Sequence, residues 1–301
     1  MYRYAAQLLH AAVHQPADLT YQADAITSIP QRGRMIPVPV QIDQTASTDP
    51  TKRNMALSAN LGKDEKIYYH GFSSAANGLK RAARGDNEKL LNANYSAVYE
   101  GQDEVAGRPV DILSVRPIHE GRPQLTLWMD KETHVILRQR KVTPDNELCS
   151  DMTIQSIHYG QPKPNYKHIA SHIRVKNGKW PLTSVQLEKE TGFRTIRPSF
   201  LPAGFKAGNQ GVYFCPCNCG MKSQALRYTD GLASFTVFET SDTRIVCKNA
   251  EAEVLAKLNS CTTGKIDGDM LAGMKRGHLL VAVIGDLTHS DARKIALSVN
   301  P

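Results

Sequence analysis

Five short strand-like segments separated by turn residues are the feature that most restricts the fold of this chain. They cover residues 95–100, 108–116, 124–129, 135–142 and 152–159. Gly107, Gly121 and the Pro144-Asp145-Asn146 turn lie between them. Connections this short join antiparallel strands, because a parallel pair needs a crossover of a dozen residues or more. The pattern predicts an α+β fold with a curved antiparallel sheet or open barrel that carries helices.

The residues before this run predict more strands and two helices. Strand-like segments cover residues 18–29, 35–42, 55–59 and 66–70, and Pro37 and Pro39 favour an edge or irregular position for the second of them. Apolar residues at helical spacing predict an amphipathic first helix, through Ala5, Leu8, Leu9 and Ala12, and a second helix over residues 75–92.

The length of 301 residues favours two domains, which we place at residues 1–190 and 197–301. The segment 192–204 ends in Pro202-Ala203-Gly204 and marks the boundary, after a last strand pair at 183–188. The second domain is expected to be a small α+β unit. It would contain a hairpin over 227–239, a helix over 249–259, strands over 270–275 and 278–284, and a closing helix over 290–298 with Ser290 as its N-cap.

The composition is that of a globular protein with a basic surface. The formal net charge is +8 and 41% of the residues are hydrophobic, but no apolar run approaches the ~18 residues of a membrane-spanning helix. Gln7 and His10 interrupt the first apolar stretch, so we expect that the signal peptide of an exported protein would lie outside this sequence. A basic surface favours anionic partners, although the dispersed Lys and Arg residues and the lack of a recognition motif argue against nucleic acid.

Six cysteines allow two kinds of chemistry. They are Cys149, Cys215, Cys217, Cys219, Cys247 and Cys261. The Cys-X-Cys-X-Cys run could bind zinc or copper(I) with Met221 or another cysteine as the fourth ligand, but zinc knuckles usually have two residues between cysteines. We favour disulfides that stabilise the second domain over a metal site or a redox site, with the pairing left open.

The histidines and the other reactive residues do not predict an enzyme. His10 and His14 lie four residues apart on the expected first helix, without an acidic residue at the spacing of a zinc protease motif, and are interpreted as a solvated face. His168 and His172 have the same spacing in a segment that is not helical in character. A nucleophile motif and a phosphate-binding loop are both missing, so we expect neither catalysis nor a cofactor or metal.

Five stretches carry a resemblance to a known family. They are residues 94–117, which contain VAGR, residues 125–142, which begin LTLWMDKET, and FLPAGFK at 200–206, LRYTDGLASFTVFE at 226–239 and GHLLVAVIGDLTHSDARKIALSV at 277–299. In these motifs and in their order the chain resembles the RseB/MucB family of periplasmic sigma-E regulatory proteins. The cysteine-rich insertion departs from the family pattern.

The resemblance implies both a fold and a function. The first domain would be similar to the lipoprotein carriers LolA and LolB, a half-open β-barrel with an apolar interior and a helical lid. The second domain would help to hold the periplasmic part of an anti-sigma factor, and lipopolysaccharide or lipoprotein acyl chains would release it. Candidate residues for the apolar interior are Tyr69, Tyr95, Leu113, Leu125 and Trp128, although periodicity alone favours an ordinary filled core.

The resemblance leaves two alternatives to a regulator that binds an anti-sigma factor. One is a lipoprotein or lipid carrier of the LolA type, in which the first domain does the work. The other is a periplasmic thiol or metal module built on Cys215, Cys217 and Cys219.

Overall fold

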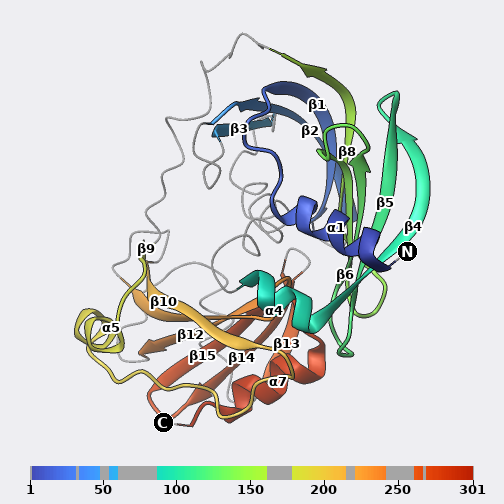
Figure 1. Cartoon of the computed structure of the whole chain (residues 1–301). Coiled ribbons are helices and arrows are strands. Elements are labelled where there is room, and N and C mark those ends of the chain that lie inside the picture. The colour runs from blue at the N-terminus through green and yellow to red at the C-terminus, as the bar shows by residue number, and fades with distance from the viewer. Residues whose placement is uncertain are drawn as a thin grey trace. The chain divides into compact units, whose positions relative to one another are not determined.

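The computed structural model describes residues 2–31, 34–47, 54–59, 87–160, 178–214, 221–241, 261–266 and 269–300. The chain divides into two compact units, Met1–Ile173 and Arg174–Pro301, each built around one antiparallel sheet (Figure 1). The predicted α+β class is therefore confirmed. None of the helices among these residues is long and apolar enough to cross a membrane.

The first unit is built on an open eight-stranded antiparallel sheet. Its strands are β1 (Tyr21–Gln31), β2 (Arg34–Thr45), β3 (Asn54–Ala59), β4 (Tyr95–Val105), β5 (Arg108–Pro117), β6 (Gln124–Asp130), β7 (Ile136–Val142) and β8 (Leu148–Tyr159). The order across the sheet is β3-β2-β1-β8-β7-β6-β5-β4, so β3 and β4 are not paired with each other and the sheet is half open. The predicted five-strand run is confirmed as β4–β8.

The prolines of β2 lie where one side of the strand is not paired within the described residues. Pro37 pairs with Ser28 and Pro39 with Ile26 of β1, whereas β3 pairs with residues 40–45 of β2. Proline has no amide hydrogen to donate, which suits such a place. The strand expected at 66–70 lies outside the described residues.

Helix α1 (Tyr2–Val13) lies across the sheet against β4 and β5 (Figure 1). Its sheet-facing side is apolar and buried, as the sequence predicts, and consists of Ala5, Leu8, Leu9, Ala12 and Val13. Helix α4 (Asn87–Asn94) runs directly into β4 and is the last part of the helix expected over 75–92, whose other residues lie outside the described residues.

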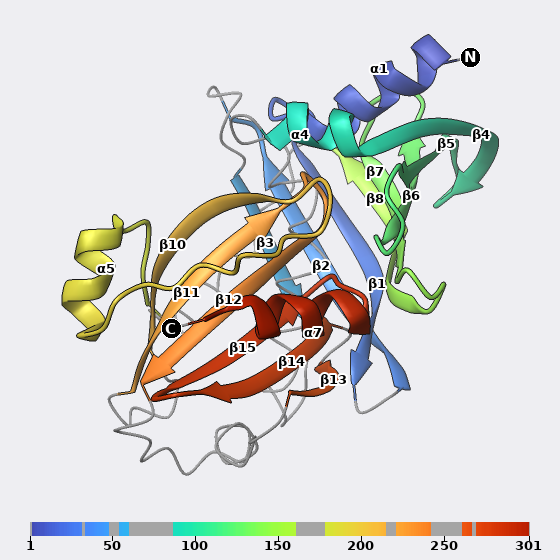
Figure 2. The ribbon, with the colours of Figure 1, turned by 90° about the horizontal axis from the view of Figure 1, so that it is seen from below.

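The second unit is a seven-stranded antiparallel sheet with a helix packed against it (Figure 2). Its strands are β9 (Gly178–Lys179), β10 (Lys206–Phe214), β11 (Lys222–Thr229), β12 (Ser234–Ser241), β13 (Thr262–Ile266), β14 (Asp269–Arg276) and β15 (Leu279–Gly285). Helix α7 (His289–Ser298) packs on β13–β15 through Ala292, Ile295 and Ala296. Its N-cap is Thr288 and not Ser290, because the Thr288 hydroxyl accepts from the amide of Asp291. The helix expected at 249–259 lies outside the described residues.

Residues 183–191 correct two predictions. They form a helix, α5 (Ser184–Thr191), in place of the expected strand pair at 183–188. A capping box of Thr183 and Gln186 begins this helix, and Gly192 in a left-handed conformation ends it. The buried Leu187 belongs to the core of the second unit, and β9 pairs with β10. The boundary therefore falls near residue 174, and residues 174–190 join the second unit.

Candidate functional site

Three of the predicted interior residues share one face of the first sheet. Leu113 pairs with Leu127, and Leu125 pairs with Val115, two residues further along β5. Tyr95 pairs with Pro117, which continues the same alternation, so Tyr95, Leu113 and Leu125 point to one side. All three are buried, with exposed fractions of 3%, 0% and 2%.

Helix α1 covers this same face. Asp111 precedes Leu113 by two residues and therefore points to the same side. Its carboxylate accepts hydrogen bonds from Tyr4 of α1, at 2.5 Å, and from Tyr99 of β4, at 3.2 Å. The rings of Tyr4 and Tyr99 pack edge to face with centroids 5.3 Å apart. The hydrogen bond to Asp111 raises the pKa of Tyr4 to about 12.

The other end of α1 is anchored at the turn between β6 and β7. The Gln15 side chain donates to the carbonyl of His134 at 2.8 Å and accepts from the amide of Ile136 at 3.1 Å. Polar contacts thus hold α1 at both ends, and its middle makes apolar contacts. Helix α1 therefore covers the apolar face and is held by polar contacts near its two ends.

The remaining two candidates do not join this group. Trp128 pairs with Ile112 and points to the opposite side of the sheet from Leu127, where the guanidinium of Arg138 lies 4.6 Å from the ring centroid. Tyr69 lies outside the described residues. Leu125 and Trp128 are three positions apart on β6. Side chains an odd number of positions apart on a strand point to opposite faces, so the sequence alone already separates these two residues.

The VAGR and LWMD strings meet in an ion-pair cluster. Arg108 of the first string forms an ion pair with the buried Asp130 of the second, and its Nη2 donates to Glu132 at 2.8 Å. Asp130 also accepts from the amides of Glu132 and Thr133 at the tip of the β6–β7 hairpin. Burial alone would raise the pKa of Asp130, but these donors, Arg108 first among them, outweigh burial and lower it.

The motifs of the second unit also build the fold. Asp230 is buried in the hairpin turn and accepts from the amides of Leu232 and Ala233. Asp286, in the VIGDL string, accepts from the amide of Ser234. Gly285 has φ of +153°, and a Cβ there would lie 2.3 Å from the Ser234 carbonyl oxygen, so this position requires glycine. These strings are structural elements of β12 and β15.

The cysteine hypothesis is left open by the described part of the chain. Cys215, Cys217, Cys219 and Cys247 lie outside it, and Cys149 is half-buried. Cys261 is a half-buried thiol whose pKa is raised by burial. The disulfide and metal alternatives therefore remain predictions.

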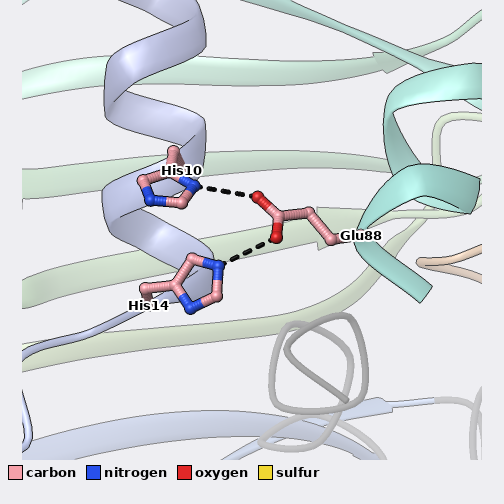
Figure 3. A group of neighbouring side chains, drawn as sticks. All are labelled: His10, His14 and Glu88. Carbon is pink, nitrogen blue, oxygen red and sulfur yellow. Dashed lines mark hydrogen bonds and ion pairs between the residues drawn. The ribbon is translucent and has the colours of Figure 1, made fainter. Parts of the chain in front are cut away.

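One cluster of titratable groups was missed at the level of sequence. His10 of α1 and His14, just after it, both face Glu88 of α4 (Figure 3). The His10 Nδ1 and His14 Nε2 atoms each lie 2.9 Å from a different Glu88 carboxylate oxygen. Burial alone would raise the pKa of Glu88, but the hydrogen bonds with His14 and His10 lower it. Glu88 is 74 residues from His14, so no local spacing could have revealed the cluster.

The fold defines a two-unit α+β protein whose first unit is a half-open antiparallel sheet under a helix. Residues 53–181 match the family model of the MucB/RseB N-terminal domain. The chain is 22% identical to the sigma-E factor regulatory protein RseB of Escherichia coli (strain K12), over 70% of this chain and 61% of that protein. It is 24% identical to the sigma factor AlgU regulatory protein MucB of Pseudomonas aeruginosa, over 69% of this chain and 61% of that protein.

The structure is also similar to solved structures of MucB. The crystal structure of MucB in complex with MucA(peri) matches with a TM-score of 0.64 and 16% identity, over 100% of this chain and 99% of that chain. The MucA/MucB complex of Pseudomonas aeruginosa matches with a TM-score of 0.61 and 16% identity, over 99% and 98%. The predicted resemblance to the RseB/MucB family is therefore confirmed, and the chain has the MucB fold. It spans about three fifths of the length of the two curated relatives.

Proposed function

We propose that this protein is an extracytoplasmic, non-enzymatic regulator that binds the periplasmic segment of an anti-sigma factor. The observation that carries the proposal is the match of both units to MucB, a protein whose solved complex contains MucA(peri). Residues of the motifs that carry the resemblance form the Arg108–Asp130 ion pair and the pairing of β12 with β15. These motifs therefore stabilise the fold that the chain has in common with MucB. The net charge of +8 suits a partner segment rich in acidic residues.

The test is direct binding between the full chain and the purified periplasmic segment of an anti-sigma factor from the same genome. Titration calorimetry is expected to give a saturable complex of defined stoichiometry. The matched control is a peptide of the same composition in scrambled order, because a merely electrostatic attraction would bind both and weaken equally with added salt. No complex, or equal binding of the scrambled segment, would rule out the proposal.

We further propose that an acyl chain, from a lipoprotein or lipopolysaccharide, binds the apolar face beneath α1. Tyr95, Leu113 and Leu125 are buried there, and α1 is anchored through Tyr4 and Gln15 at its ends. An acyl chain would replace the apolar side of α1, so the two compete for the same surface.

A fluorescent acyl probe tests this ligand. Tyr4→Phe removes the hydroxyl that binds Asp111, loosens α1 and is expected to strengthen probe binding by roughly fivefold to tenfold. Tyr2→Phe is the matched control, because the Tyr2 side chain is 91% exposed. Unchanged probe binding in the Tyr4 variant would contradict a site under α1. Stoichiometric probe uptake without any anti-sigma factor binding would favour the carrier alternative.

A further inference from the structure

We propose that His10, His14 and Glu88 bind one divalent transition-metal ion, with Zn²⁺ as the ion that suits them best. The ligand atoms of these three side chains all lie within 4.8 Å of one another (Figure 3). None of the three takes part in the function proposed above, so the metal site stands or falls independently of it.

The backbone presents the two histidines as a chelating pair. The amide of His14 donates to the carbonyl of His10 at 2.9 Å, so the helical hydrogen-bond pattern of α1 reaches His14. Residues four apart on a helix lie on one face. The two imidazole rings accordingly lie with centroids 4.4 Å apart. Glu88, in the first turn of α4, supplies the third ligand from a separate helix.

The ligand types agree with zinc. Two imidazole nitrogens and one carboxylate oxygen are a common three-ligand set, and water completes the tetrahedron. Zinc–ligand bonds of about 2.0–2.2 Å place neighbouring ligand atoms roughly 3.3 Å apart. The present separations need only small side-chain rotations. These rotations are open to His10 and His14, whose side chains are 67% and 45% exposed.

Without a metal the same atoms form exposed hydrogen bonds. Such pairs contribute about 0–1 kcal/mol each, so they hold α1 and α4 together only weakly. A metal ion takes the place of the ring protons that face Glu88 and joins α1 to α4, which continues directly into β4. Metal binding would therefore fix the helix that covers the apolar face of the sheet.

The test is a Zn²⁺ titration of the metal-free full chain by calorimetry at mildly alkaline pH, because protons compete with Zn²⁺ for its ligands. His10→Gln, His14→Gln and Glu88→Gln are each expected to lose one equivalent of bound zinc, or to bind it about tenfold more weakly or worse. His158→Gln is the matched control, since His158 is exposed on β8, away from this cluster in the sequence, and should keep the wild-type stoichiometry. Comparison between variants removes any contribution from the cysteines, which all the proteins share.

Thermal unfolding gives a second measurement. Zn²⁺ is expected to raise the Tm of the wild type and of His158→Gln, and to raise it less in the three cluster variants. The proposal is overturned if the wild type binds no zinc, or if all three variants keep its stoichiometry and affinity within about twofold. Circular dichroism of the metal-free variants establishes that each is folded, and the three separate substitutions guard against one that is not.

Discussion

Glu239 is a glutamate held entirely out of water on β12. Its Oε2 accepts from the amide of Ile196 at 3.2 Å, and its Oε1 has no partner within the described residues. Its cross-strand neighbour Gln224 is in a similar state, since Nε2 donates to Thr191 and Phe193 and leaves Oε1 unpaired. Burial raises the pKa of Glu239 to about 7. Gln224 and Glu239 are directly paired across the two strands, so both unpaired oxygens lie on the same face of the sheet, and a proton on Glu239 removes the buried negative charge there.

This arrangement predicts a pH-dependent free energy of unfolding. Because the folded-state pKa of about 7 exceeds the ordinary value of 4.5, the folded state binds the extra proton between these two values. The contribution of Glu239 to the free energy of unfolding is therefore full below pH 4.5, falls as the pH rises to 7, and stays low above it, by roughly 3 kcal/mol in total. Glu239→Gln is expected to flatten this dependence and to raise stability at pH 8, as measured by urea unfolding at a series of pH values.

The control for this measurement is Glu104→Gln, which changes an exposed glutamate on β4. It should keep the wild-type profile. If Glu239→Gln keeps the slope between pH 4.5 and 7, Glu239 is not the group that titrates.

At the residue scale, the sequence predicts features that arise from neighbouring residues and does not predict contacts between distant ones. Alternation along β5 and β6 is local, so the shared face of Leu113 and Leu125 follows from it, as does the separation of Trp128. The contact of His10 and His14 with Glu88 depends on how α1 and α4 pack. The hydrogen-bond partner of Asp111 is Tyr4, which is over a hundred residues away in the sequence. Such contacts arise from tertiary packing and leave no periodic signal.

At the scale of elements, the hairpin between β6 and β7 depends on one buried charge. Arg108→Ala leaves Asp130, which is 1% exposed, with its backbone donors and the Tyr159 hydroxyl at 3.5 Å but without its ion pair to Arg108, and is expected to cost about 3 kcal/mol of unfolding free energy. Arg116→Ala is the matched control, because it breaks the exposed Arg116–Glu100 pair in the same sheet and should cost under ~1 kcal/mol. Urea unfolding of both variants checks this. Equal costs would show that burial of Asp130 does not matter.

Helix α1 is predicted to open locally more readily once one anchor is removed. Tyr4→Phe keeps the ring contact with Tyr99 but removes the hydrogen bond to Asp111. Hydrogen exchange of the α1 amides is expected to become about fivefold to tenfold faster, as a lost hydrogen bond of ~1 kcal/mol implies, while exchange in β7 is unchanged. Uniformly faster exchange in both elements would indicate global destabilisation and contradict local opening of α1.

The elements themselves follow from the sequence where turn residues punctuate a regular alternation. That holds for β4–β8 and for the hairpin of β11 and β12. It fails at residues 183–191, where Val185 and Leu187 suggest alternation, although the capping box of Thr183 and Gln186 and the glycine at 192 are helix signals in the same segment. In this segment the residues that begin and end a helix determine the structure, and the strand-like alternation of Val185 and Leu187 does not.

At the scale of the whole molecule, the division into units depends on the shortest strand of the second sheet. β9 has two residues, too few for any period to show, yet it pairs with Val212 and Tyr213 of β10. Trp180 follows it and packs so closely that a Cβ at Gly211 would lie 2.5 Å from the indole. The guanidinium of Arg227 lies 4.3 Å from the Trp180 ring centroid on that side. These contacts explain why the second unit begins near residue 174, well before the segment 192–204.

The boundary predicts different stabilities for two truncated chains. Residues 174–301 keep β9, Trp180 and α5, whereas residues 197–301 lose them together with Leu187, which is fully buried in the core of the second unit. The loss of that side chain alone costs about 3 kcal/mol, so the shorter chain is expected to unfold at a much lower urea concentration. Far-UV circular dichroism is the suitable probe, because Trp180 is absent from the shorter chain, and reducing conditions keep cysteine pairing out of the comparison. Equal midpoints would mean that residues 174–196 are only an extension of the second unit, and the contacts of Leu187 and Trp180 would then contribute little to its stability.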